Sequence, residues 1–308
     1  MVGTWMILLR SEATLKQAVR FSGIGVHNGL RSNIRVMPCT AGSGITFKRV
    51  DVQGKDPCIQ INPEAVVDAT MCTRISNRNG VTVAVIEHLL AALRICGITN
   101  AEVEVDADEV PIMDGSAIEF VRAFKKCGIK YQNAFVPAIV VSKPVSVSYK
   151  NTEISIVPAD KSEFHVELDY ERINPVISRN KCYEFTFDDD LTGVACARTF
   201  GWLADCEKLY EMGLAKGASE ENTVVITDDN TIKNEGGLRN PKEIVMHKCL
   251  DMIGDISVIG YDIIGRIEAK NPSHFANNLL MRKLLGELDE HGVIVAEPET
   301  ENRFVQFA

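Results

Sequence analysis

The sequence predicts an α+β fold built from two similar halves. In each half, several short alternating runs are followed by helical, strand and helical patterns in the same order. Apolar residues make up 45% of the 308-residue chain and charged residues 24%, which is typical of a globular protein with a sizeable core. A histidine stands near the start of the corresponding helix of each half, at His88 and His247. We therefore expect a duplicated α+β unit with a metal between the halves.

The elements of the first half follow from residue periodicity and turn residues. Residues 12–50 alternate in short runs that glycines interrupt, which predicts strands and turns. A helix is expected over 86–95, with Gly97 as its left-handed cap. Residues 101–106 alternate apolar and charged side chains, as a half-buried strand does. A second helix should cover 117–127 and end at Gly128.

The second half repeats this order after an expected linker over 130–137. Its strands are predicted over four ranges, 138–147, 153–157, 163–169 and 181–187. A short amphipathic helix over 202–212 precedes a long helix that opens at Pro241. A strand near 263–268 and a last helix over 273–288 complete the chain.

Composition argues against several classes of protein. A net charge of -9 and a pI near 5.3 disfavour nucleic-acid binding as the main role. Nine cysteines without a CxxC pair are typical of free thiols in a reducing compartment. The apolar run 5–9 is too short for a signal peptide or a membrane span, and no later run is long enough. We expect a cytoplasmic protein without an integral membrane segment.

Two short segments together suggest a catalytic metal site. Residues four apart share one face of a helix, so His247 and Asp251 can hold one ion together. His88 would supply the third ligand and leave its neighbour Glu87 free to transfer protons. Three protein ligands with one open position are typical of catalytic zinc, so the pattern indicates a metal-dependent hydrolase.

Each of these segments alone is weak evidence for a metal site, because His-x3-Asp on a helix more often forms a surface ion pair. The combination is stronger, since His88 stands in an apolar run where an unpaired imidazole is costly to bury. His165, within a predicted strand, and His291, after the last helix, are expected to be structural.

Further motifs make the chain similar to a known family. They are Gly23–Gly29 (GIGVHNG), Ile86–Leu93 (IEHLLAAL), Val110–Ala117 (VPIMDGSA), Ala197–Gly201 (ARTFG), Gly237–Arg239 (GLR), His247–Asp255 with its two aspartates, and His274 before Asn277–Asn278. In this order they resemble the zinc-dependent UDP-3-O-acyl-N-acetylglucosamine deacetylases of lipid A biosynthesis. The resemblance spans nearly the whole chain.

The resemblance implies a fold of two tandem two-layer β-α-α-β sandwich units, with helices packed inward and a small insert in each unit. The units would cover residues 1–132 and 138–308, and the second would carry an acyl-passage insert at about 200–235. It also implies a monomer that acts on a UDP-sugar bearing a fatty acyl chain and removes its N-acetyl group.

Roles for individual residues follow from the same resemblance. One Zn²⁺ per chain would be held by His88, His247 and Asp251, with ferrous iron as an alternative metal. The expected catalytic groups are the base Glu87, the protonated His274, and the supporting Thr199, Lys248 and Asp255. Zinc would activate water and polarise the amide carbonyl.

Substrate-binding positions are expected at Met71, Cys72, Phe200, Leu203, Cys206 and Lys270. The apolar stripe over 202–210 either lines the acyl passage or belongs to the core. Cys72, near the passage mouth, is a candidate for reaction with thiol reagents.

The chain departs from the family pattern before His274. The family commonly has Lys-Ser-Gly-His, whereas Lys270 is followed here by Asn271-Pro272-Ser273. This shift leaves the diphosphate contact open and keeps two alternatives in play. One is a zinc hydrolase for another N-acylated nucleotide sugar, and the other is a non-catalytic binding homologue, which the intact ligand and base residues disfavour.

Overall fold

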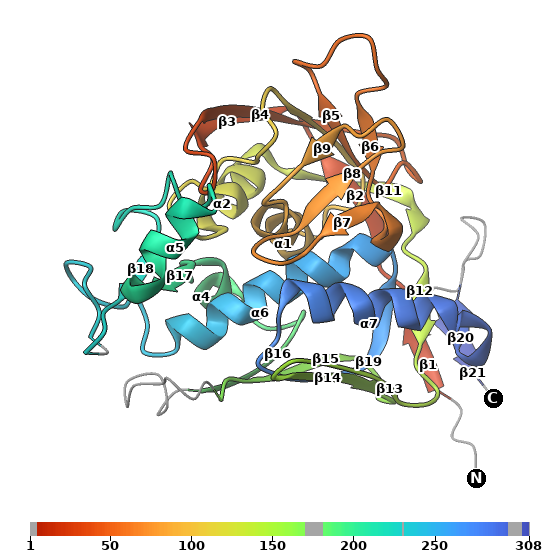
Figure 1. The fold of residues 1–308 in the computed structure, drawn as a ribbon. Helices are drawn as coiled ribbons and strands as arrows, with labels where there is room; N and C mark the ends of the chain where they lie inside the picture. Colours follow the sequence, from red (N-terminus) through yellow and green to blue (C-terminus); the bar gives the residue numbers. More distant parts are fainter. Residues whose placement is uncertain (1–4, 170–180, 230, 295–303, 308) are drawn as a thin grey trace.

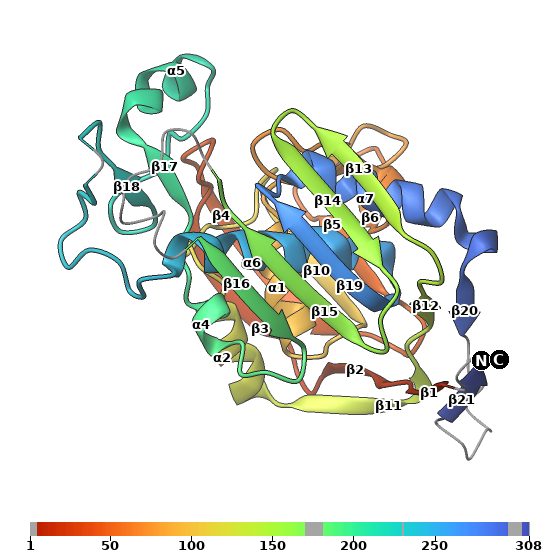
Figure 2. The ribbon, with the colours of Figure 1, turned by 90° about the horizontal axis from the view of Figure 1, so that it is seen from below.

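The computed structural model describes residues 5–169, 181–229, 231–294 and 304–307, and its fold is α+β, as the sequence predicts. Figure 1 shows a layered arrangement, in which helices lie between an upper and a lower sheet. The upper sheet and the helices next to it come from the first half of the chain. The lower sheet, seen face-on in Figure 2, comes from the second half. The boundary at residues 132–138 stays a prediction.

The upper sheet owes its one-sided burial to strict alternation. Its strand order is β3 (Val19–Ile24), β4 (Arg31–Pro38), β10 (Ala101–Val105), β5 (Ile45–Arg49) and β6 (Cys58–Gln60). In β10 the alanine and valines are buried, whereas Glu104 faces outward and pairs with Arg35 of β4. A small sheet of β7 (Val66–Asp68), β8 (Arg74–Ser76) and β9 (Thr82–Val83) leads into the first helix.

The lower sheet is centred on β19 (Asp262–Lys270), whose alternate residues are buried. It also contains β12 (Ala138–Val140), β13 (Val145–Tyr149), β14 (Thr152–Val157), β15 (Ser162–Glu167), β16 (Cys182–Thr186) and β20 (Gly292–Ile294). β19 pairs antiparallel with β14 and parallel with β12 and β15. The single strand predicted over 138–147 is instead two strands, β12 and β13, joined by residues 141–144.

The helices between the sheets are those that the sequence predicts. They are α1 (Glu87–Ile95), α2 (Ile118–Cys127), α6 (Glu243–Ile256) and α7 (His274–Gly286). Gly97 and Gly128 both adopt positive φ just after α1 and α2, as expected for helix ends. Shorter helical turns are η1 (Pro63–Ala65), α4 (Thr192–Ala195), η3 (Ser257–Ile259) and η4 (Leu288–Glu290).

The segment near residues 200–235 stands at one end of the sandwich (Figures 1 and 2). It contains β17 (Phe200–Trp202), η2 (Leu203–Asp205), α5 (Cys206–Glu211) and β18 (Val224–Ile226), and β17 pairs parallel with β18. The helix predicted over 202–212 is thus shorter and begins with a 3-10 turn.

The expected linker over 130–137 is wrong for most of its length. Ile129–Phe135 forms strand β11, which pairs antiparallel with β2 (Ser11–Leu15). Its polar residues hide the strand in the sequence, because the partner strand lies more than 100 residues away. A further pair joins β1 (Trp5–Leu8) to β21 (Phe304–Phe307).

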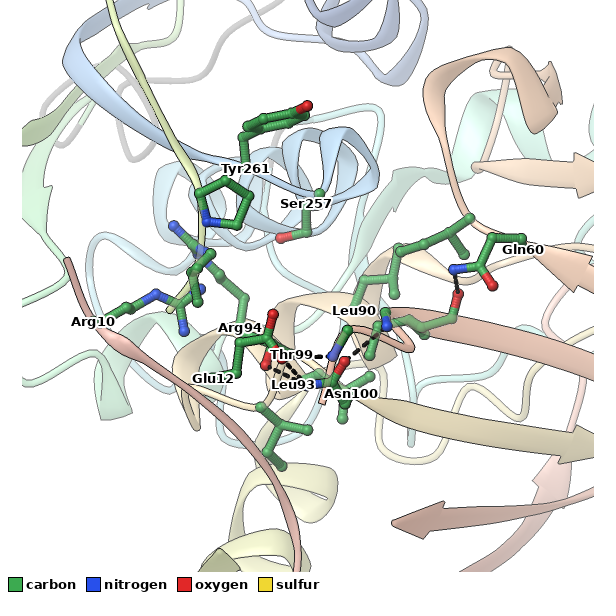
Figure 3. Close-up of a pocket in the computed structure, with 18 residues that line it drawn as sticks. Arg10, Glu12, Gln60, Leu90, Leu93, Arg94, Thr99, Asn100, Ser257 and Tyr261 are labelled. Atoms are coloured by element: carbon green, nitrogen blue, oxygen red, sulfur yellow. Dashed lines mark hydrogen bonds between the residues drawn. The ribbon is translucent and has the colours of Figure 1, made fainter. Parts of the chain in front are cut away.

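Besides the β1–β21 pair, a charge cluster at the C-terminal end of α1 links the two halves of the chain. Asp262, at the start of β19, accepts hydrogen bonds from Arg10 at 2.8 and 3.0 Å and from Arg94 of α1 at 2.5 Å. Figure 3 shows both arginines beside a cavity of about 260 Å³, which none of the predicted site residues lines. Because the three side chains are mostly buried, the pairing ties α1 to the lower sheet.

The helices α1 and α6 cross at a glycine. A Cβ atom placed on Gly254 would lie 2.1 Å from the backbone oxygen of Glu87, so only glycine allows this approach.

In the part of the chain that the structure describes, no helix combines the length and the apolar character that a membrane span needs.

We expect Gly254→Ala to lower the free energy of unfolding by about 3 kcal/mol, because the new methyl group must push backbone apart. It should also lower the hydrolase activity expected from the sequence about 100-fold, since the predicted metal ligands on α1 and α6 would lose their alignment. Gly286→Ala is the matched control, because Gly286 ends α7 and a Cβ there meets nothing within 4 Å. Thermal denaturation and activity assays of both variants test this; equal stability of the two would contradict it.

Candidate metal centre and active site

Three buried side chains converge where α1 meets α6. His88 belongs to the first turn of α1, and His247 and Asp251 lie one turn apart on α6. The Nε2 atoms of His88 and His247 lie 3.6 and 3.2 Å from Asp251 Oδ1. One nitrogen or oxygen of each residue lies within 4.8 Å of the others, as a shared metal ion requires. The spacing of the three predicted ligands is therefore compatible with one ion.

The donor atoms of this cluster are poised for a cation. Asp251 Oδ1 is buried and accepts no hydrogen bond from the described residues, although two imidazoles face it. His247 Nδ1 lies 3.0 Å from the carbonyl oxygen of Ala197, which can only accept, so the ring donates there and Nε2 keeps its lone pair. Burial lowers the pKa of His247 to about 3, which keeps the ring neutral.

Charge around Asp251 favours its ionised form. Burial would raise the pKa of this carboxyl group, but the positive charge of Lys248 holds it well below its usual range. Lys248 Nζ lies 2.8 Å from Asp251 Oδ2 and 5.6 Å from the centre of the Phe200 ring. An ionised carboxylate beside the imidazoles of His88 and His247 is a donor set suited to a divalent transition metal.

Glu87 and His274 lie at the two ends of a chain of hydrogen bonds that runs through Thr73 and Asp255. Thr73 links them, since its backbone N–H donates to Glu87 Oε2 at 3.0 Å and its hydroxyl donates to Asp255 Oδ1 at 2.6 Å. Asp255 Oδ2 in turn lies 2.8 Å from His274 Nδ1 and accepts a hydrogen bond from Asn277. The chain holds both ionisable groups in fixed positions.

The pKa values of Glu87 and His274 are both raised, but for different reasons. Burial raises the pKa of Glu87, even though His274 and His88 oppose it. Burial alone would lower the pKa of His274, but the charge and hydrogen bond of Asp255 outweigh it and raise the pKa to about 9. At neutral pH His274 is therefore a cation, as the resemblance implies.

The cluster opens into a cavity of about 880 Å³ that contains most of the predicted site residues. Those on its wall are Met71, Glu87, His88, Thr199, Phe200, Cys206, His247, Lys248, Asp251, Lys270 and His274. Asp255 lies behind His274, and Leu203 and Cys72 do not line the cavity. Cys72 is 6% exposed and burial raises its pKa, so we expect its thiol to react poorly.

Several residues of this cavity were not singled out from the sequence. His27, from the glycine-rich motif, lines it with a buried Nδ1 that has no hydrogen-bond partner among the described residues, and burial lowers its pKa to about 4. The glycine spacing around His27 is a sequence signal that marks this loop as a cavity wall. Asn271 also lines the cavity, and the sequence marked it only as part of the altered segment before His274. Thr73, behind the cavity wall, gave no signal, because its importance depends on a distant partner.

The loop of His27 also holds the 200–235 segment in place. Lys216 and Gly217 donate backbone hydrogen bonds to the carbonyl oxygens of His27 and Val26, both at 3.0 Å. A Cβ on Gly217 would lie 2.2 Å from the backbone oxygen of Gly25, so the two backbones meet without room for a side chain. One wall of the cavity is therefore built from both halves of the chain.

Comparisons with known proteins agree with the motifs. The family described as UDP-3-O-acyl N-acetylglycosamine deacetylase matches residues 12–286. A relative named UDP-3-O-acyl-N-acetylglucosamine deacetylase from Phenylobacterium zucineum is 42% identical over 90% of this chain and 94% of its own length. Relatives of the same name from Geobacter sp. (40% identical, 94% of both chains) and Myxococcus xanthus (38% identical, 93% and 90%) are similar. The chain therefore belongs to the UDP-3-O-acyl N-acetylglycosamine deacetylase family.

Proposed function

We propose that this protein hydrolyses the N-acetyl group of UDP-3-O-acyl-N-acetylglucosamine, which releases acetate and leaves the free 2-amine needed for lipid A biosynthesis. The names of the relatives support the substrate. The observation on which the proposal rests is that one cavity collects the His88–His247–Asp251 cluster, Glu87 and His274. This combination provides an electrophile site, a base and an acid within reach of one bound amide.

The metal of this proposal is one Zn²⁺ per chain, held by His88, His247 and Asp251. The neutral His247 imidazole and Asp251 Oδ1, which accepts no hydrogen bond from the described residues, fit such an ion. When bound, zinc supplies a Lewis acid that polarises the amide carbonyl and acidifies water. Ferrous iron is compatible with the same donors.

The chain's own residues would handle the protons. Glu87, with a free Oε1 beside the cluster, takes the proton of the attacking water as general base. The cationic His274 stabilises the developing negative charge and protonates the leaving amine, while Asp255 orients its ring. The Thr199 hydroxyl is placed on the same wall to donate to the oxyanion, and Lys248 adds positive charge.

The walls of the cavity match the two ends of this substrate. Phe200, Trp202, Cys206 and Leu209, at the 200–235 end, form an apolar side that suits an acyl chain. Lysines and polar side chains border the other side, near Lys270, and suit a diphosphate. Leu203 and Cys72 would support substrate binding from positions just behind the cavity wall. We further propose a cytoplasmic monomer that does not bind nucleic acid.

Turnover of two substrates tests the proposed reaction. We expect deacetylation of the 3-O-acylated UDP-sugar with a kcat/KM at least about 1,000-fold above that of UDP-N-acetylglucosamine, because each buried methylene contributes about 0.8 kcal/mol. Equal rates would instead favour a hydrolase for another N-acylated nucleotide sugar. Binding without turnover of either compound, in zinc-loaded protein, would favour the non-catalytic homologue.

Two substitutions separate metal binding from proton transfer. His247→Ala should lose both the bound zinc and at least about 1,000-fold of activity, because a ligand and the Lewis acid disappear together. Glu87→Gln should keep about one equivalent of zinc yet lose about 100- to 10,000-fold, because only the base is missing. Metal analysis and initial rates measure both. Full zinc occupancy in His247→Ala would overturn the ligand assignment.

The pH dependence of kcat/KM should be bell-shaped. Activity needs ionised Glu87 on the acid side and protonated His274 on the alkaline side, so the rate should fall above about pH 9, the pKa of His274. Asp255→Asn removes the carboxylate that raises this pKa, and the alkaline limb should therefore move to lower pH. His165→Gln, on the outer face of the lower sheet, is the control and should leave the profile unchanged. An unmoved limb in Asp255→Asn would exclude His274 as the acid.

A further inference from the structure

The segment between β19 and α7 contains an unusual residue, Asn271. It is 4% exposed and its φ is +49°, a left-handed conformation that is uncommon for a residue other than glycine. It also borders the 880 Å³ cavity, two residues after Ala269 and three before His274. A buried amide in such a conformation must find hydrogen-bond partners, and these partners show what the residue does.

The Asn271 side chain joins two other segments of the cavity rim. Its Nδ2 donates to the carbonyl oxygens of Asn151, at 3.2 Å, and Asp169, at 3.0 Å. Its Oδ1 accepts from the backbone N–H of Asp169 at 2.6 Å. Both amide hydrogens and the amide oxygen are thus used on backbone groups, which fixes the β13–β14 turn against the end of β15.

The backbone of Asn271 adds two further links. Its N–H donates to the backbone carbonyl oxygen of Glu167 at 2.8 Å, and its own carbonyl oxygen accepts from the Thr152 hydroxyl at 2.6 Å. Thr152 Oγ1 also lies 3.3 Å from the hydroxyl of Ser273, which caps the start of α7. Three rim segments therefore meet at one residue.

Two lysines flank the clamped groups and face the same cavity. Lys150 precedes Asn151, and Lys270 precedes Asn271, with its Nζ 3.1 Å from Asp169 Oδ2. Strand pairing in β19 holds the backbone of Lys270, and the Asn271 amide holds the carbonyl group of Asn151 and the backbone of Asp169. The position of Lys150 and of the Asp169 partner relative to Lys270 therefore depends on this amide. His274 is held independently, by Asp255 on α6.

We propose that Asn271 is a positioning residue that sets Lys150 and Lys270 for the diphosphate of the UDP-sugar. This inference rests on the proposed function. It accounts for the departure from the family pattern at this segment, because asparagine tolerates the left-handed conformation that the lengthened connection to His274 requires here. Since the reacting groups have their own anchors, loss of the Asn271 amide should weaken binding of the nucleotide and leave the chemical step intact.

Asn271→Gly tests this directly, because glycine keeps the left-handed backbone and removes only the amide. We expect the Kd of UDP, measured by calorimetry on zinc-loaded protein, and the KM of the acylated UDP-sugar each to rise about tenfold, with kcat within twofold and an unchanged alkaline limb. Asn271→Asp places an oxygen against two carbonyl oxygens and should raise both constants further. Asn79→Gly, in an exposed turn, is the matched control and should change neither.

A double-mutant cycle shows whether Asn271 acts through the lysines. In a Lys150→Gln/Lys270→Gln background, Asn271→Gly should change the Kd of UDP by less than twofold. A fall in kcat at constant KM, an unchanged Kd of UDP in Asn271→Gly, or a full tenfold effect without the lysines would overturn the inference. A different result would separate the two proposals. If Asn271→Gly weakens UDP binding as expected but the wild-type protein does not deacetylate the acylated UDP-sugar, the proposed function is refuted and this inference stands.

Discussion

The site depends on the contact of α1 with α6 at Gly254. Because a backbone oxygen of Glu87 fills the space that any larger residue would need, the two helices cross at their closest approach beside the first turn of α1. This contact brings His88 to the ligand pair on α6, although the residues lie about 160 positions apart in the chain. The same approach leaves Glu87 next to the cluster, so one steric constraint positions both the proposed metal ligands and the proposed base.

Electrostatics then decides which form each buried group takes. Buried carboxyl groups and imidazoles, of which this site has three each, would normally be neutral, since burial penalises charge. Here Asp251 stays ionised because the Lys248 ammonium group faces it, and His274 stays cationic because the Asp255 carboxylate faces it. Thr73 bridges Glu87 and Asp255, yet the two carboxyl groups have different surroundings: Glu87 lines the cavity, whereas Asp255 bonds to Thr73, Asn277 and His274. A site with both a base and an acid follows from these placements.

Local pattern was enough to predict the four main helices, the ligand turn on α6 and the one-sided strands, because periodicity and spacing are local properties. Strand β11 escaped prediction, since Lys130 and Gln132 weaken its apolar pattern and its partner β2 is far away in sequence. Thr73 escaped for the same reason: its hydroxyl reaches Asp255 across 182 residues. The family resemblance supplied candidate roles that no spacing alone could assign, but it gave no role to Asn271.

The segment before His274 shows how a local change can leave chemistry intact while altering a binding surface. Its start is fixed by β19 and its end by the Ser273 cap and the Asp255–His274 bond, so an altered connection between them can change only the rim. A glycine there would adopt the same φ but would leave the carbonyl groups of Asn151 and Asp169 without this donor. Asparagine supplies both the conformation and the hydrogen bonds. The catalytic centre and the nucleotide rim can therefore vary independently, because they are anchored to different elements, α6 for the first and the β13–β15 edge for the second.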